Sequence, residues 1–117
     1  MTNPGTTLEP GTIVLIPFPF SDLSSTKKRP VLVLTAPDRH SDFIAAGITS
    51  VEQKTGAVAL ETAHLLRGRL PKKSWIRTDK LFTLSSEIVV KNFGAIRPDT
   101  FKQVMQAICR TIGCPPK

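Results

Sequence analysis

Residues 27–35, KKRPVLVLT, join a short cationic segment to a run of four apolar residues. The run is too short for an ordinary helix and is rich in Val and Leu, so it predicts a buried strand over residues 31–35. Pro30 suits the start of that strand because it has no backbone N–H to pair. Arg29 would then lie at the mouth of a buried strand, where the core beneath it holds the guanidinium in place. Taken alone, the cationic segment is more typical of a solvated loop than of a binding site.

Further segments with β-branched and apolar residues predict additional strands along the chain. They are residues 12–16, 43–49, 57–60, 74–79, 88–90 and 93–96, the last two joined by a turn at Asn92. Gly47 marks a bulge or a close backbone approach within its strand. Residues 74–79 alternate apolar and polar positions, which places Trp75, Arg77 and Asp79 on one face of a half-buried strand.

The C-terminal part changes to helical spacing. The apolar positions that recur at this spacing are Phe101, Val104, Met105, Ile108 and Ile112. Pro98 and Asp99 suit the first turn of such a helix, and Gly113 followed by Pro115 suits its end. Many short strands closed by one helix predict a mainly β (α+β) fold, a small β-barrel or strongly bent sheet with a C-terminal α-helix packed on it. No helical segment separates the strands, which argues against a parallel sheet.

The length of 117 residues indicates one domain. We expect residues 1–10 to be a flexible N-terminal arm, 11–114 the domain and 115–117 a tail. No apolar stretch approaches membrane-spanning length and residues 1–10 lack a signal-peptide core, so we expect a soluble cytoplasmic protein that does not contact a membrane. Cys109 and Cys114 have neither metal-ligand nor Cys-x-x-Cys spacing, and His40 and His64 are isolated. The sequence therefore predicts no metal and no cofactor.

Basic residues are in excess and clustered. Sixteen Lys and Arg face nine Asp and Glu, for a formal net charge of +7. One cluster is residues 27–29. The other consists of Arg67, Arg69, Lys72, Lys73, Arg77 and Lys80, with Asp79 as the only acid among them. Clustered positive charge favours a polyanionic partner, either nucleic acid or an acidic protein segment, although general solubility is a serious alternative.

Polar residues at the expected strand ends are the candidates for chemistry. They are Arg29, Thr49, Ser50, Arg77 and Asp79. Taken singly, each has a more common structural role, as a strand terminus whose hydroxyls bond the backbone or as a surface ion pair. Together they could supply what RNA cleavage by the 2′-hydroxyl requires: Asp79 is a candidate base, Arg29 and Arg77 are candidate charge stabilisers, and Thr49 is a candidate donor to a phosphoryl oxygen. The sequence does not decide which group acts as base and which as acid. Trp75 could stack a base, but it is at least as typical of a core residue.

Four segments in register resemble the MazF/PemK family of toxins. They are residues 11–18 (GTIVLIPF), 28–34 (KRPVLVL), 46–50 (AGITS) and 70–81 (LPKKSWIRTDKL). The Arg-Pro start of the second segment and the Ile-Thr-Ser end of the third are the most specific parts. The resemblance runs in order from about Gly11 to Ile112. Members of this family commonly carry a Gly- and Gln-containing loop before Arg-Pro, whereas residues 21–28 here read SDLSSTKK.

The resemblance implies an SH3-like barrel that forms a homodimer and acts as the toxin of a type II toxin–antitoxin pair. It implies a sequence-specific endoribonuclease (mRNA interferase) that cuts single-stranded RNA without metal, leaving 2′,3′-cyclic phosphate and 5′-hydroxyl ends. The family's Arg-Pro arginine falls on Arg29 and its strand-end threonine on Thr49, followed by Ser50. The Arg-x-Asp pair of the PemK/Kid branch falls on Arg77 and Asp79.

The expected RNA-binding residues surround this set. They are Lys27, Lys28, Arg69, Lys72, Lys73, Trp75 and Lys80. The expected protein partner is a cognate antitoxin with a flexible acidic segment, and any contact with operator DNA is expected only through that antitoxin. Two alternatives to the toxin are a non-catalytic nucleic-acid-binding barrel and a protein-interaction module of the same SH3-like fold.

Overall fold

The structure is a computed structural model that describes residues 8–17 and 28–114. The expectations for residues 1–7, for the loop 18–27 with Lys27 and for residues 115–117 lie outside the described residues. Seven strands are present: β1 (Thr12–Pro17), β2 (Lys28–Val33), β3 (Asp42–Thr49), β4 (Ala57–Leu60), β5 (Leu65–Arg67), β6 (Ser74–Ser85) and β7 (Lys91–Ile96). Two 3₁₀ turns, η1 (Thr62–His64) and η2 (Ser86–Ile88), precede the C-terminal helix α1 (Pro98–Ile112).

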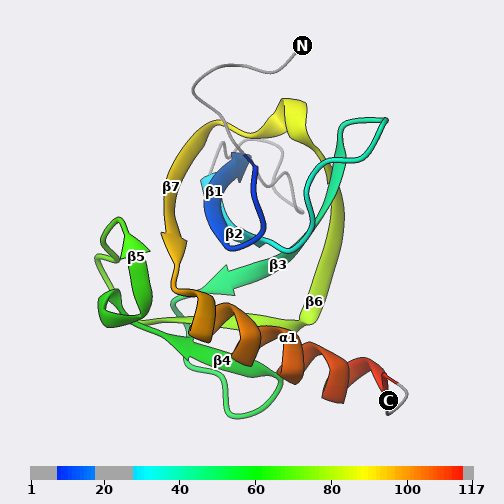
Figure 1. Cartoon of the computed structure of the whole chain (residues 1–117). Helices are drawn as coiled ribbons and strands as arrows, with labels where there is room; N and C mark the ends of the chain where they lie inside the picture. The colour runs from blue at the N-terminus through cyan, green and yellow to red at the C-terminus, as the bar shows by residue number, and fades with distance from the viewer. Residues whose placement is uncertain (1–7, 18–27, 115–117) are drawn as a thin grey trace.

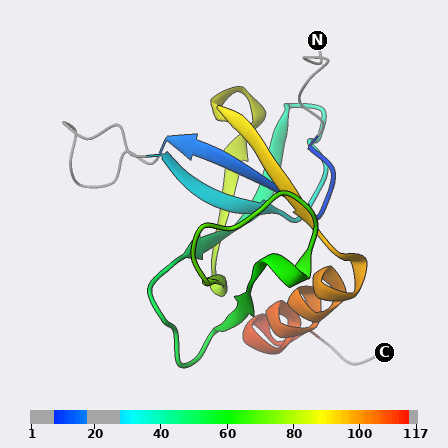
Figure 2. The same cartoon turned by 90° about the vertical axis from the view of Figure 1, so that its left-hand side faces the viewer.

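The strands form one curled sheet in the order β4-β6-β3-β2-β1-β7-β5. Every neighbouring pair is antiparallel. Curling brings β7 and β6 to opposite sides of the molecule with β1 and β2 between them, and α1 lies across the end formed by β4 (Figure 1). The same arrangement is seen from the side in Figure 2, where α1 lies beneath the sheet. The predicted fold class, a strongly bent sheet with a packed C-terminal helix, is confirmed.

Two core clusters bury both faces of the central strands. Alternate residues of one strand enter different clusters: Leu32 contributes to the cluster that α1 covers, whereas Val31 and Val33 contribute to the other. Val104 and Ile108 of α1 complete the first cluster. Because β1, β2 and β3 are buried on both faces, their sequences are nearly continuous apolar runs instead of alternating patterns.

The helix begins and ends as its sequence predicts. Pro98 occupies the first turn, and Gly113 ends the helix in the left-handed region at φ 74°. The Thr111 hydroxyl lies 3.4 Å from the buried Thr78 hydroxyl, which fixes the end of α1 against β6. In the described part of the chain, α1 included, no helix has the length and apolar character needed to span a membrane.

Among the predicted strands that form, β2 and β6 differ most from the sequence prediction, because pairing extends or shortens them. β2 begins at Lys28 instead of Val31, since Lys28 and Arg29 pair with β1, and it ends before Thr35. β6 continues past Asp79 to Ser85 because its second half pairs with the first half of β3. The short strand β5 was not predicted, since two leucines give too little pattern to distinguish a strand.

The predicted strand over residues 88–90 and the turn at Asn92 are wrong. Ile88 ends η2, where the Ser85 hydroxyl accepts a hydrogen bond from the Glu87 backbone N–H at 3.2 Å. This local side-chain bond competes with strand pairing. Asn92 lies inside β7 and pairs with Val14 of β1.

A bulge in β6 changes its register against β3. Ala46 pairs with Leu81, but the next residue, Gly47, pairs with Arg77, so residues 78–80 have no partner on β3. A Cβ atom on Gly47 would lie 3.4 Å from the Phe82 ring, a tight contact. The expectation that Gly47 marks a bulge is therefore confirmed. The bulge carries Asp79 out of the regular ladder.

Candidate functional site

The pairing of β3 with its two neighbours aligns the polar residues of three strands. Gly47 pairs with both Val31 of β2 and Arg77 of β6, and Thr49 pairs with Trp75. Directly opposite residues of antiparallel strands point to the same face. Continuing the β2–β3 register by two residues places Arg29 beside Thr49. Arg29, Thr49, Trp75 and Arg77 therefore project from one face of the sheet.

Arg77 and Asp79 form a bidentate ion pair. The Arg77 Nε and Nη2 atoms donate to Asp79 Oδ1 and Oδ2 at 3.2 and 3.1 Å. The two side chains are 30% and 38% exposed, so solvent screens the pair and its stabilisation is at most about 1 kcal/mol. Its geometry is nevertheless defined, because a planar guanidinium binds both carboxylate oxygens at once. The paired guanidinium and carboxylate remain accessible from solution.

Gly56 supports the Asp79 carboxylate from the connection between β3 and β4. The Thr78 N–H donates to the Gly56 carbonyl oxygen at 2.9 Å, which ties the connection to the bulge. Gly56 has φ +69°, and a Cβ atom built on it would lie 3.0 Å from Asp79 Oδ2. A side chain at this position would be both strained and in contact with the carboxylate, so only glycine fits without adjustment.

Trp75 is half-buried on the same face as Arg77. The Lys73 ammonium lies 5.5 Å from the centre of the Trp75 ring, a cation–π arrangement. Trp75 is therefore neither a full core residue nor an open stacking platform. Lys80, on the bulge, and Arg69, in the loop before β6, are exposed.

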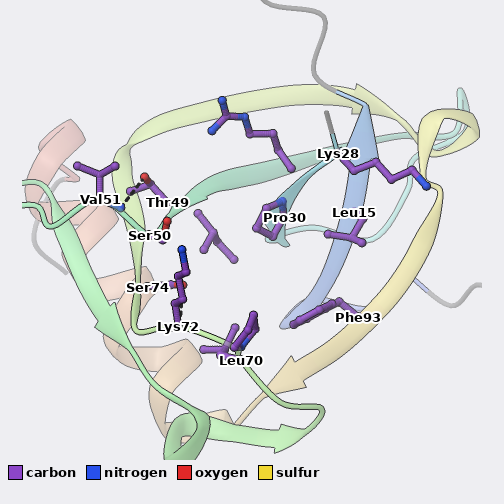
Figure 3. A pocket seen from close by; sticks show the side chains of 13 residues that line it. Leu15, Lys28, Pro30, Thr49, Ser50, Val51, Leu70, Lys72, Ser74 and Phe93 are labelled. Atoms are coloured by element: carbon purple, nitrogen blue, oxygen red, sulfur yellow. Dashed lines mark hydrogen bonds between the residues drawn. The ribbon is translucent and has the colours of Figure 1, made fainter. Parts of the chain in front are cut away.

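A pocket of about 350 Å³ opens at the start of β2, the end of β3 and the start of β6 (Figure 3). Its apolar residues are Leu15, Pro30, Ile48, Val51, Leu70, Pro71 and Phe93. Its polar residues are Lys28, Arg29, Thr49, Ser50, Lys72 and Ser74. Pro30, Ile48 and Ser74 alternate with Arg29, Thr49 and Trp75 along the same strands, so the pocket lies on the sheet face opposite to Arg77.

The predicted site residues thus divide into two groups that meet at the edge of the sheet where Arg29 and Thr49 lie, which we call the rim. Lys28, Arg29, Thr49, Ser50 and Lys72 line the pocket. A second group, Trp75, Arg77 and Asp79, lies on the other face of β6 and does not line it. Because Arg29 and Thr49 end their strands, they border the pocket and also belong to the face that carries Arg77.

The charge of the pocket is entirely positive among its described lining residues. Lys28, Arg29 and Lys72 contribute cations, and no Asp or Glu is present in the lining. The Thr49 hydroxyl accepts from the Val51 N–H at 3.1 Å and so keeps its own proton available to donate. The Ser74 hydroxyl donates to the Lys72 carbonyl oxygen at 3.1 Å, which ties the preceding loop to β6. Such a site suits an anion.

The acids with clearly shifted pKa values lie outside this site. Backbone N–H groups, chiefly that of Asp42, lower the pKa of Asp38 in an exposed turn. Desolvation raises the pKa of Asp99 at the start of α1, but the hydrogen bonds from the Arg97 side chain and the Thr100 backbone N–H, with the charge of Arg97, together outweigh it and leave this pKa below its ordinary value. Across residues 8–17 and 28–114, no group of three His, Cys, Asp or Glu side chains is placed to hold a metal ion.

The isolated histidines and cysteines have structural positions. The His64 Nδ1 accepts from the Glu61 backbone N–H at 2.9 Å and so helps to close η1, and His40 is exposed in a turn. Cys109 is half-buried in α1 and Cys114 is exposed beyond it. The contact with the Cys109 side chain raises the pKa of the Cys114 thiol.

The sequence does not predict the apolar residues that form the floor of the pocket. Leu15, Leu70 and Phe93 come from β1, the loop before β6 and β7, which meet only after the sheet has curled. Each is an ordinary apolar residue of a strand or loop in the sequence. Leu15, Pro30 and Leu70 lie within the segments that resemble the toxin family, but nothing in those segments indicates that they line one pocket.

Comparison with known proteins identifies both the fold and a sequence family. A sequence model of the PemK-like, MazF-like toxins of type II toxin–antitoxin systems matches residues 9–112. No curated protein sequence matches the chain significantly.

Three solved structures share the fold over most of their length. An endoribonuclease in complex with its cognate antitoxin, from mycobacterial species, has a TM-score of 0.72 at 19% identity, covering 93% of this chain and 98% of that one. The Mycobacterium tuberculosis toxin MazF-mt6 has a TM-score of 0.71 at 19% identity, covering 90% and 99%. The MazE–MazF complex (Form-II) from Deinococcus radiodurans has a TM-score of 0.69 at 16% identity, covering 94% and 99%.

The contact between Gly56 and Asp79 predicts a specific effect of Gly56→Ala, for which Gly113→Ala is a matched control. Both glycines have positive φ, +69° and +74°, but nothing lies within 4 Å of a Cβ atom on Gly113. Each substitution should destabilise the fold by about 1–2 kcal/mol, measured by urea unfolding, because alanine disfavours this backbone region. Only Gly56→Ala should also shift the NMR resonance of the Arg77 Nε–H, by displacing its carboxylate partner. An unchanged Arg77 signal in folded Gly56→Ala protein would show that Gly56 does not position the pair.

Proposed function

The chain belongs to the PemK-like, MazF-like toxins of type II toxin–antitoxin systems, and from that membership we propose that it is an endoribonuclease that cleaves single-stranded RNA. The reaction is transfer of the phosphodiester to the 2′-hydroxyl, which leaves a 2′,3′-cyclic phosphate and a 5′-hydroxyl. Its site is the face of β2, β3 and β6 that carries Arg29, Thr49, Arg77 and Asp79.

One observation carries this proposal: residues from three strands, distant in the sequence, converge on one face at one end of the sheet. Arg29 is the second residue of β2, Thr49 ends β3, and Arg77 directly precedes the bulge of β6 that contains Asp79. Neighbouring strands are about 4.8 Å apart, so arginines on β2 and β6 can reach a phosphate that lies over β3. The Phe82 ring packs against Gly47 on this face, so the phosphate would lie toward Thr49 at the end of β3.

The chemistry follows from what each group can accept or donate. The Asp79 carboxylate takes the proton of the 2′-hydroxyl while the 2′-oxygen attacks phosphorus. Both Asp79 oxygens already accept one bond from Arg77, but each has a further lone pair for the hydroxyl. The bond from phosphorus to the 5′-oxygen breaks, and water at this exposed rim protonates the leaving oxygen. Arg29 and the Thr49 hydroxyl hold the phosphoryl oxygens as their charge grows.

The nucleophile explains why the proposed reaction needs no metal ion. A 2′-hydroxyl is already part of the substrate and lies next to the scissile phosphate, so no water molecule has to be activated in its place. The charge on the phosphorane-like transition state is met by guanidinium groups, which remain protonated throughout. Sequence specificity would come from contacts with the bases that flank the cleaved bond.

Arg29→Ala should reduce RNA cleavage by about 10²–10³-fold, because one charge-stabilising donor is lost from the transition state. Arg29 is exposed at the start of β2, so the fold should tolerate the change. The measurement is single-turnover cleavage of a single-stranded RNA in excess chelator, with circular dichroism to confirm folding. Exposed Arg39, in the turn before β3, supplies a matched control. Arg39→Ala removes the same charge far from the rim, so this variant should cleave RNA at nearly the wild-type rate. Equal cleavage rates for Arg29→Ala and Arg39→Ala would exclude Arg29 from the mechanism.

We further propose that a cognate antitoxin inhibits the protein by laying a flexible acidic segment along the same cationic rim. The basis is charge, since nine of the sixteen basic residues lie in residues 27–29 and 67–80. Complementary acidic residues would be steered to this surface, and RNA phosphates would meet the same cations.

Competition tests the shared surface. An acidic antitoxin peptide should displace a short uncleavable RNA, as followed by fluorescence anisotropy, and the affinities of both should fall as salt concentration rises. Simultaneous binding of peptide and RNA with unchanged affinities would mean that inhibition acts from a separate surface.

A homodimer is proposed through an apolar patch on the face that α1 covers. Ile44, Leu81 and Ile112 are large apolar residues exposed by 41%, 37% and 61%. Ile44 and Leu81 project from β3 and β6 on the same side as Ala46, and Ile112 ends the helix that packs beside Thr78. Exposed apolar residues gathered on one side are typical of an interaction surface, and this one leaves the Arg77 face free.

Leu81→Lys should convert the dimer to a monomer at micromolar concentration in sedimentation velocity, because a buried unpaired charge would oppose association. Leu66→Lys, on β5 and 66% exposed, is the matched control and should remain dimeric. A wild-type monomer, or a dimer that survives Leu81→Lys, would contradict this interface.

A further inference from the structure

We propose that the pocket beside Lys72 is a base-binding subsite that selects a nucleobase with a carbonyl oxygen next to a ring N–H, that is, uracil or guanine. This inference rests on the proposed function, because it assumes that RNA crosses the rim formed by Arg29 and Thr49. It adds to that function the side chain that reads one nucleotide.

The shape of the pocket suits one flat apolar ring. Its volume of about 350 Å³ lies at the small end of ligand sites, which range over about 300–1,000 Å³. Leu15, Pro30, Ile48, Leu70 and Phe93 form its apolar surfaces. An unstacked base needs such surfaces to replace its neighbours in the strand, and Phe93 supplies an aromatic one.

Lys72, an exposed residue of the lining, supplies a hydrogen-bond donor at the side of this apolar space. Figure 3 shows its side chain extending from the loop before β6 across the pocket toward Ser50. An ammonium group has three donors and no acceptor. It can therefore bind the O4 atom of uracil or the O6 atom of guanine. Cytosine and adenine carry an amino group at the same position, and that group would face Lys72 as one donor against another.

Ser74 supplies the matching acceptor. Its hydroxyl proton is directed to the Lys72 carbonyl oxygen at 3.1 Å, so its remaining lone pairs can accept the ring N–H of uracil or guanine. Ser74 is only 8% exposed and is held by β6, so both the acceptor and the backbone of Lys72 have fixed positions. A donor and an acceptor in one lining, with no carboxylate among the described residues that line the pocket, are complementary to the carbonyl and N–H edge.

Lys28 provides an internal contrast to Lys72. Its side chain borders the same pocket but extends away from the centre (Figure 3). A cation in that position can meet a phosphate but not the edge of a base inside the pocket. Phosphate contacts strengthen binding for every sequence alike, whereas base contacts change preference.

The rim connects this pocket to the proposed reaction. Arg29 and Thr49 line the pocket and also belong to the face that carries Arg77. A nucleotide whose phosphate lies on the rim can therefore place its base in the pocket. The selected base would belong to a nucleotide next to the cleaved bond, so cleavage should require uracil or guanine at that position.

The test compares short 2′-O-methyl RNAs, which cannot be cleaved, by fluorescence anisotropy with three proteins: wild type, Lys72→Met and Lys28→Met. Oligouridylate should bind to the wild type about tenfold more tightly than oligocytidylate, the discrimination expected of a base-edge contact. Alternating guanosine–adenosine RNA should likewise bind more tightly than oligoadenylate. Lys72→Met should reduce these affinity ratios to nearly one. Lys28→Met should instead lower the affinity for all four RNAs by a similar factor and leave the ratios unchanged.

Three outcomes would overturn the proposal. The first is a wild type that binds uridine and cytidine oligomers equally. The second is a Lys72→Met protein whose affinities for the uridine and cytidine oligomers fall by the same factor, as the loss of a phosphate contact would cause. The third is a Lys72→Met protein that loses affinity for an acidic peptide but not for any RNA, which would assign the pocket to a protein partner. Cleavage of a long RNA separates this test from the proposed function, since Lys72→Met should still cleave but at additional sites, whereas a wild type without any cleavage would contradict the function itself.

Discussion

The register of β3 against both of its neighbours is the constraint on which the rest of the structure depends. Side chains alternate between the two faces of a strand, so a slip of one residue would exchange every face. Such a slip is costly here because Ala45 and Ala46 are both fully buried and belong to different core clusters. The same pairing that packs the two cores therefore holds Thr49 between Arg29 and Trp75.

The bulge in β6 adapts this rigid frame to the proposed chemistry. It releases residues 78–80 from β3, so that Asp79 can turn back to pair with Arg77 instead of continuing the ladder. Gly47 and Gly56, on either side, supply close backbone surfaces that a larger residue would block. The rigid strand ends then hold Arg29 and Thr49, while the loop before β6 adds Lys72 to the pocket on the other face.

Much of this arrangement was predictable because it depends on local patterns. The apolar run after Arg29-Pro30, the alternation over residues 74–79 and the helical spacing up to Ile112 each predicted their element, and the family resemblance is confirmed. What depends on pairing was not predictable. Residues 88–90 resemble a strand by composition, yet Ser85 caps a 3₁₀ turn that ends at Ile88, and Val89 and Val90 only connect this turn to β7. The pocket floor joins Leu15, Leu70 and Phe93 only through the curl of the sheet, which no single segment encodes. The catalytic roles of Arg29, Thr49, Ser50, Arg77 and Asp79 stay predictions.

The central claim is that Arg29 on β2 and Arg77 on β6 act on one phosphate across β3. A double-mutant cycle on single-turnover cleavage tests it most directly, using Arg29→Ala, Arg77→Ala and the double variant, each shown to be folded. Residues that act as a unit lose much of their joint effect once either is removed. The account predicts that the double variant cleaves RNA far faster than the product of the two single losses implies. If the losses simply multiply, the two arginines act independently and the shared site is wrong.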